Sequence, residues 1–149
     1  MNKEEMKIGF GLARIKTEQF ATIETSYQDG KPANFSVSVN IKADTKAHII
    51  AVLMKIVFEQ EKIPFLVLEA CCDFLIVKED WEKLINPEGT SVEFPQGFIA
   101  HLAMLTVGTL RGILHTKTEN TKFNKFLLPT INVTEIVKEN VSFPLNQNL

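Results

Sequence analysis

The stretch PQGFIAHLAMLTVGTLRGILHT, residues 95–116, decides the fold of this 149-residue chain. Pro95 suits the first position of a helix, and no Asp, Glu, Lys or Arg follows it until Arg111. At helical spacing, one apolar stripe contains Ile99, Leu102, Ala103, Thr106, Leu110, Ile113 and Leu114, and Phe98, Leu105 and Thr109 widen it. A surface helix normally pairs one apolar stripe with a polar face. We therefore predict a long helix that is apolar on two faces.

A helix with two apolar faces needs two partners, and a single small sheet can cover only one of them. Gly108 and Gly112 lie four residues apart on one side of the helix and permit close approach of another element. We predict that the second face is a subunit interface, with Ile99, Ala103, Gly108 and Gly112 as candidate residues. The alternative is a helix at the centre of the domain's own core.

The residues before this helix predict an antiparallel sheet. Residues 35–42 alternate apolar and polar side chains, with Phe35, Val37, Val39 and Ile41 facing inward. Residues 49–60 and 65–77 alternate in the same way, with apolar residues at the even positions. A first strand within residues 8–27, interrupted near Lys16-Thr17, completes a four-stranded sheet. The predicted fold class is α+β, with this sheet packed on one long C-terminal helix.

Two short helices are also expected. Residues 78–85 precede the turn Asn86-Pro87-Glu88-Gly89, and Asn132 followed three positions later by Glu135 is a capping-box pattern that predicts a second helix through residue 139. We expect residues 140–149 to be a mobile tail. The chain is then a single domain, residues 1–149, with an ordered core over residues 8–139.

Composition narrows the classes of function. Apolar residues make up 45% of the chain, which supports a real core, and 16 Lys and Arg against 18 Asp and Glu give a net charge of −2. Without a basic stripe, nucleic-acid binding is not expected. The charged first residues lack a secretory signal pattern, and we find no apolar run of the about 20 residues that span a membrane. We expect a cytoplasmic protein without membrane insertion.

Groups capable of catalysis are sparse. Cys71 and Cys72 are neighbours that point to opposite faces of a strand, so we expect two reduced thiols. His101 and His115 lie about 21 Å apart along the helix and cannot share a metal ion within one subunit. No phosphate-binding loop, dinucleotide fingerprint or nucleophile elbow occurs. We expect no metal, no cofactor and no enzymatic activity.

The C-terminal third carries a family resemblance. Phe94-Pro95 precedes the helix, Arg111-Gly112 lies in its second half, and Leu127-Leu128-Pro129-Thr130-Ile131-Asn132 follows a polar loop. With the order of the strands, residues 8–139 resemble the SecB family of protein-export chaperones. The chain differs from that family at Cys71-Cys72-Asp73-Phe74, where the family has a glycine-rich strand end, and in its tail.

The resemblance implies an ATP-independent holdase that binds unfolded preproteins and keeps them competent for export. It also implies a homotetramer, a dimer of dimers with the long helices between two sheets. In the family, acidic residues on the outer sheet face contact the translocase motor ATPase. Glu69 matches such a position here, and Glu18 and Glu24 are further candidates.

A holdase needs an apolar groove for many weak contacts with loose polypeptide. The candidate groove residues are Phe98, Leu102, Leu105, Phe123, Phe126 and Leu128, with ordinary core packing as the alternative for each. Two other functions remain open. One is a dedicated SecB-like chaperone of a single unstable partner, such as an antitoxin. The other is a small enzyme or ligand-binding domain on a similar frame.

Overall fold

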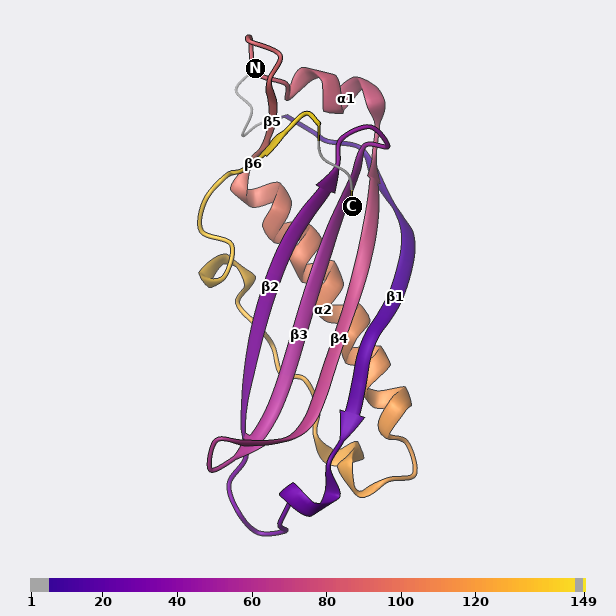
Figure 1. Ribbon diagram of the computed structural model, residues 1–149, viewed down its shortest axis with the longest axis vertical. Helices are drawn as coiled ribbons and strands as arrows, with labels where there is room; N and C mark the ends of the chain where they lie inside the picture. The colour runs from indigo at the N-terminus through magenta and orange to yellow at the C-terminus, as the bar shows by residue number, and fades with distance from the viewer. Residues whose placement is uncertain (1–5, 147–148) are drawn as a thin grey trace.

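The computed structural model describes residues 6–146 and residue 149, and it has the predicted α+β class (Figure 1). The strands are β1 (Phe10–Thr22), β2 (Asn34–Asp44), β3 (Ile49–Gln60), β4 (Ile63–Ile76), β5 (Ser91–Phe94) and β6 (Val141–Pro144). The helices are α1 (Lys78–Lys83) and α2 (Gln96–Thr118), with 3₁₀ turns η2 (Glu24–Ser26), η3 (Lys122–Lys125) and η4 (Val133–Glu135). The prediction of a helix over 78–85 is confirmed by α1.

Four strands form an antiparallel sheet in the order β1-β4-β3-β2. Strands β2, β3 and β4 follow one another as a meander, and β1 pairs with the other side of β4. The break expected near Lys16-Thr17 is a register shift between Thr17 and Gln19. Because side chains alternate along a strand, the register collects the even positions of β3 and β4 on one buried face, as predicted.

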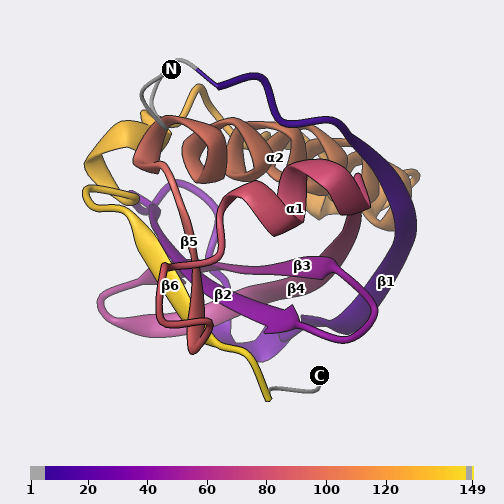
Figure 2. The same ribbon diagram turned by 90° about the horizontal axis from the view of Figure 1, so that it is seen from above.

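Helix α2 forms a second layer on that face (Figure 2). It contacts β3 and β4 and buries Ile99, Ala100, Leu102, Ala103, Thr106, Val107, Leu110, Leu114 and Thr118. Ile99 and Ala103 are therefore core residues covered by the subunit's own sheet, which agrees with the alternative of a helix in the domain's own core, and the subunit interface stays a prediction. Gly108 and Gly112 are exposed.

Helix α2 is longer and more uniformly apolar than we expected of any segment of this chain. By length and composition alone, α2 is apolar enough to cross a membrane, with a mean hydropathy of 1.5 over its most apolar window. The prediction that the chain has no apolar run long enough to span a membrane is therefore wrong. A core helix passes the same test, and 44% of that window is buried inside the structure.

The C-terminal segment differs from the expected mobile tail. Strand β6 pairs with β5, with Val92 opposite Phe143, and both of these side chains are buried. The tail prediction is thus wrong for residues 141–144, because apolar side chains and backbone pairing hold them to the core. Residues 147 and 148 of that tail, and residues 1–5 of the predicted single domain, lie outside the described residues.

The second predicted helix, over 132–139, is instead the single 3₁₀ turn η4. The cap itself is present, because Asn132 Oδ1 accepts a hydrogen bond from the Thr134 amide at 3.2 Å. Residues 137–140, beyond η4, are bound by Gln96 and do not continue as a helix. The Gln96 side chain donates to the Val137 carbonyl at 2.7 Å, and its backbone amide donates to Asn140 Oδ1 at 2.8 Å.

Candidate peptide-binding groove

Strand β2 is an edge strand with little protection. Within the described residues, β2 pairs only with β3, and the register runs without a bulge from Asn34 opposite Glu59 to Asp44 opposite Ile49. Residues 34–41 contain no charged residue and no proline. Natural edge strands are normally blocked by charges, proline or bulges. The outer edge of β2 can therefore accept a further strand through its free backbone groups.

The other edge strand, β1, is protected in the usual ways. Its pairing with β4 is shifted twice, between Leu12 and Arg14 and between Thr17 and Gln19. It also carries the charged residues Arg14, Lys16 and Glu18. The two edges of the sheet thus differ in how readily they accept an extended peptide.

The side of β2 that faces the helix layer carries a row of incompletely covered apolar side chains. The row consists of Phe35, Val37, Val39 and Ile41, which lie opposite the buried residues Phe58, Ile56, Met54 and Val52 of β3. The predicted inward direction of the row is correct. However, α2 lies over β3 and β4, so the row is only half-buried and Phe35 is 41% exposed.

The C-terminal segment forms the opposite wall of a groove along this row. A cavity of about 490 Å³ lies between Val39 and Ile41 on one side and residues 136–142 on the other. Ile136 is 37% exposed at this wall, and Lys138 and Glu139 add one charge of each sign. The two hydrogen bonds from Gln96 to this segment hold the wall in place.

An aromatic cluster closes the far end of β2. The Phe35 ring lies 5.9 Å from Phe58, and the Phe126 ring lies 5.5 Å from Phe58 and 5.0 Å from Phe65. Tyr27 completes the cluster, 5.6 Å from Phe126. Phe126 therefore packs the loop after α2 against β3 and β4 of the sheet.

Lysines from η3 cover the outer side of Tyr27. Lys122 and Lys125 place their Nζ atoms 5.6 Å and 5.1 Å from the Tyr27 ring centroid, within the range of cation–π attraction. Lys125 Nζ also pairs with Asp29 Oδ1 at 3.2 Å. Hydrogen bonding from Tyr27 and then the nearby Lys125 lower the pKa of Asp29. These contacts join the loop before β2 to the loop after α2.

The six groove residues predicted from the sequence do not come together in one groove. Leu102, Phe123 and Leu128 are buried in the core, because the loop after α2 folds back against the sheet, which agrees with the alternative of ordinary core packing. Phe98 and Phe126 are half-buried at opposite ends of α2, and Leu105 is exposed on the side of α2 away from the sheet. Sequence reasoning missed the β2 edge, whose signal was the uncharged alternation over residues 34–41.

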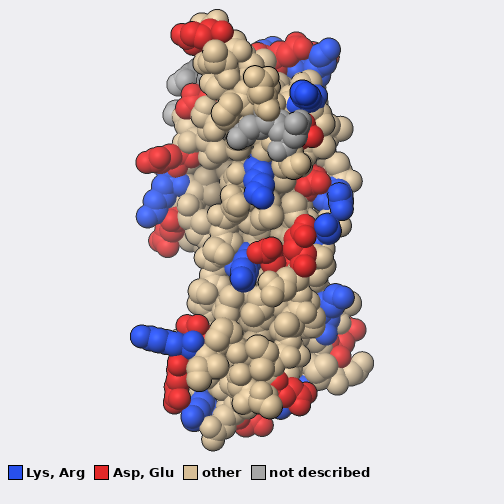
Figure 3. Space-filling model, viewed as in Figure 1, with Lys and Arg blue, Asp and Glu red and all other residues tan. Residues whose placement is uncertain are grey.

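The predicted acidic contact residues lie among cations rather than in an acidic patch. Glu18 pairs with Lys16 at 3.5 Å, and Glu24, in η2 beyond the end of β1, lies 3.9 Å from Lys122. Glu69 lies opposite Lys55 in the register of β3 and β4. Figure 3, which shows the sheet face away from α2, has acidic and basic side chains interspersed over the strands. Contact with a translocase motor through these residues remains a prediction.

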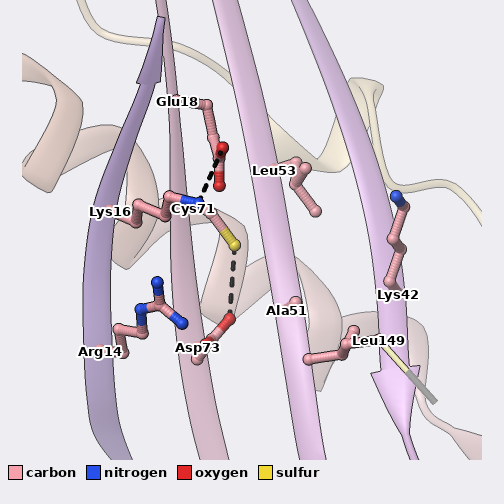
Figure 4. Close-up of a pocket in the computed structure, with 9 residues that line it drawn as sticks. All are labelled: Arg14, Lys16, Glu18, Lys42, Ala51, Leu53, Cys71, Asp73 and Leu149. Carbon is pink, nitrogen blue, oxygen red and sulfur yellow. Dashed lines mark hydrogen bonds and ion pairs between the residues drawn. The ribbon is translucent and has the colours of Figure 1, made fainter.

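The outer sheet face also contains a hollow of about 290 Å³, shown in Figure 4. Cys71 lies in its floor and donates a hydrogen bond to Asp73 Oδ1 at 3.3 Å. Burial, followed by the hydrogen bond and charge of Asp73, raises the pKa of Cys71 to about 12. Because the thiolate is the reactive form, Cys71 is a poor nucleophile at neutral pH. Among the described residues, no group of three or more His, Cys, Asp or Glu could hold a metal ion.

Comparison with known proteins gives distant structural likenesses. No family model matches the chain, and no curated protein matches its sequence. The SecB-like chaperone Rv1957 of Mycobacterium tuberculosis, solved with a ChAD peptide from the Rv1956 HigA1 antitoxin, is similar with a TM-score of 0.48 and 8% identity, over 82% of this chain and 90% of that chain. A protein of unknown function from Streptococcus agalactiae is similar with a TM-score of 0.40 and 14% identity, over 85% of this chain and 99% of that chain. These values assign no family, so the function proposed below rests on the surface of this chain.

Proposed function

We propose that this protein is an ATP-independent chaperone, a holdase without enzymatic activity, that binds extended apolar segments of unfolded preproteins at the β2 edge. One observation carries the proposal: an unprotected edge strand runs beside a half-covered apolar row and a groove. An unfolded chain offers partners for both features, namely its own unpaired backbone groups and exposed apolar side chains.

Binding would proceed by addition of a strand. A client segment in extended conformation pairs its backbone with the outer edge of β2, whose 11 residues span about 36 Å. Every second client side chain then points to the groove beside Val39 and Ile41. Backbone pairing is independent of sequence, and the apolar contacts contribute roughly 25 cal/mol per Å² buried. Such a site is tolerant of client sequence and releases clients without ATP.

We further propose that the chaperone acts in the cytoplasm as a homo-oligomer, a dimer of dimers. Met104 and Leu105 are 51% and 39% exposed on α2, which supports contact with another subunit. Several grooves on one particle would hold one client at several points and raise the overall affinity. The proposal includes docking on the translocase motor ATPase through Glu69, Glu18 and Glu24, which lie among lysines.

The proposal is tested by suppression of aggregation without nucleotide. The purified protein should prevent light scattering by a reduced, unfolding client at a few-fold excess. Ile136→Asp places a charge in the groove and should weaken suppression roughly fivefold, as loss of a central apolar contact does. Ile63→Asp is the matched control, because Ile63 is an exposed isoleucine (54%) at the β3–β4 turn, away from the groove.

Failure of the unmodified protein to suppress aggregation of any client at several-fold excess would refute the holdase function. Equal loss in both variants would place client contact outside the groove. Protection of a single unstable partner, with no effect on other unfolding proteins, would identify the dedicated chaperone instead.

A further inference from the structure

The hollow on the outer sheet face lies on the opposite side of the sheet from α2, and neither the groove nor the proposed chaperone function uses it (Figure 4). Its lining combines side chains of both charges with an apolar floor on β3. Its volume is about 290 Å³. At about 30 Å³ for one water molecule of the liquid, it has room for a ligand of roughly ten non-hydrogen atoms.

The register of the sheet places four side chains of this hollow in one row. Arg14 of β1 lies opposite Asp73 of β4, Asp73 lies opposite Ala51 of β3, and Ala51 lies opposite Lys42 of β2. Neighbouring strands are about 4.8 Å apart, so the row crosses the whole sheet. Ala51 has the shortest side chain of the four and therefore leaves space above β3 between its longer neighbours.

Arg14 and Asp73 carry opposite charges at directly opposed positions, yet they do not form an ion pair. Cross-strand neighbours of opposite charge normally attract each other. Among the described residues, however, no nitrogen of Arg14 lies within 4.0 Å of a carboxylate oxygen. On another side of the hollow, Lys16 and Glu18 do pair, at 3.5 Å. The charged groups of Arg14 and Asp73 therefore remain available to a ligand that carries both charges.

A ligand with a single charge fits this hollow poorly. Burial, and then the negative charges of Asp73 and Glu18, raise the pKa of the Cys71 thiol in the floor, so a carboxylate alone would be repelled there. An amine alone would be repelled by the guanidinium of Arg14. An α-amino acid carries its carboxylate and its ammonium group on one carbon atom, and these two groups match the adjacent charges of Arg14 and Asp73.

The rest of the hollow favours an aliphatic side chain. Ala51 and Leu53 of β3 form the part of the floor next to Asp73. Leu149 lies beside Ala51 in Figure 4, on the side of the hollow away from Arg14, and adds an aliphatic wall. A ligand whose charged groups lie at Arg14 and Asp73 would therefore extend its side chain across β3 over these apolar groups.

We propose that the outer hollow binds a free aliphatic α-amino acid such as leucine, with its carboxylate at Arg14, its ammonium group at Asp73 and its side chain over Ala51 and Leu53. The lining side chains of β1 are exposed to solvent, which weakens each charge pair. A ligand of this size then binds in the millimolar range. The inference does not depend on the chaperone function, because the groove lies on the other face of the sheet.

Three analogues of leucine, each without one of the recognised groups, test the proposal. Isocaproate lacks the ammonium group, isoamylamine lacks the carboxylate, and glycine lacks the aliphatic side chain. Titration of leucine into isotope-labelled protein should shift the NMR signals of the amides of residues 51, 53, 71 and 73 until they saturate. Each analogue should bind about fivefold more weakly than leucine, the upper range for loss of one exposed charge pair.

Variants of the protein test the same contacts from the other side. Arg14→Gln removes the partner of the carboxylate and should weaken leucine binding about fivefold. Ala51→Leu fills the space above β3 and should abolish the saturable shifts. Lys46→Gln removes one positive charge at an exposed position in the turn between β2 and β3, away from the hollow, and should bind leucine as the wild type does. The amide spectrum of each variant also shows whether it is folded.

The inference is overturned if leucine causes no saturable shifts at these amides up to its solubility limit. Equal binding of leucine and isocaproate would overturn the role of Asp73, and unchanged affinity in Arg14→Gln would overturn the role of Arg14. Suppression of aggregation is measured separately, so none of these outcomes bears on the holdase proposal.

Discussion

Single residues in this protein gain their roles from what surrounds them. Arg111 lies on a helix face that is otherwise uncharged, and two backbone carbonyls after α2 bind its guanidinium. Cys71 is half-buried in a sheet face rich in charged residues, yet its thiol donates to Asp73 and stays protonated. In both cases the chemistry of the side chain is decided by its partners, which are distant in sequence for Arg111 and on the same face of the same strand for Cys71.

The raised pKa of Cys71 predicts a resistant thiol. Between the ordinary pKa of 9.0 and about 12, the unfolded chain loses this proton while the folded chain keeps it. The contribution of Cys71 to stability therefore falls as pH rises through that window. We expect slow alkylation of the native protein at pH 8 and rapid alkylation in urea, followed by mass spectrometry.

The variant that tests this loss of stability at alkaline pH is Cys71→Ser, whose hydroxyl can still donate a hydrogen bond to Asp73. It should lose less stability than the wild type between pH 8 and pH 10 in urea titrations. Fast modification of Cys71 in the folded protein, or an identical alkaline loss in both proteins, would contradict the assigned environment.

At the level of elements, the two edges of the sheet differ in their protection against further strand pairing. Strand β1 combines register shifts with charged residues, and β2 has neither over residues 34–41. Strand β6 is only four residues long, yet it pairs with β5 and buries Phe143. Its first residues, Val141 and Ser142, also belong to the segment that forms the outer wall of the groove. Loss of β6 should therefore affect both stability and the groove.

Phe143→Ala tests the role of β6. If β6 is part of the core, this variant should lower the free energy of unfolding by about 3 kcal/mol, the usual cost of removing a buried phenylalanine. Ser142→Ala, at the neighbouring exposed position, should change it by less than about 0.5 kcal/mol. Urea unfolding measures both. Equal stabilities would mean that residues 141–144 do not hold to the core.

At the level of the whole molecule, two layers leave α2 half-covered. The sheet packs on one side of α2 (Figure 2). Met104 and Leu105 of α2 remain exposed. A third layer from a second copy would complete the coverage. The candidate groove lies along β2 at the edge of the sheet and so stays accessible in such an arrangement.

Association through α2 predicts that stability depends on protein concentration. Binding of a second copy to the folded state alone stabilises it by mass action. The melting temperature of the wild type should therefore rise with concentration. That of Gly112→Met, which places a bulky side chain on the exposed face of α2, should stay constant over the same range. A wild-type melting temperature that is independent of concentration would indicate that the exposed face of α2 is free in solution.

Local sequence patterns determined most of the architecture. The alternation over residues 35–42, 49–60 and 65–77 specifies half-buried antiparallel strands, and the apolar run from Ile99 to Leu114 specifies a long helix. These signals are strong because each repeats over many residues with the period of its own secondary structure. The sequence alone also indicated that α2 has more apolar surface than one sheet can cover.

Only the tertiary structure decided which apolar residues form the core and which remain accessible. Leu102 and Leu128 are buried, whereas Leu105, with the same side chain, is exposed, and the difference lies only in what packs over each residue. Strands β5 and β6 are four residues each, too short for a periodic signal, and they pair across a long separation in sequence. Burial and pairing of this kind depend on contacts between distant segments, which no local pattern records.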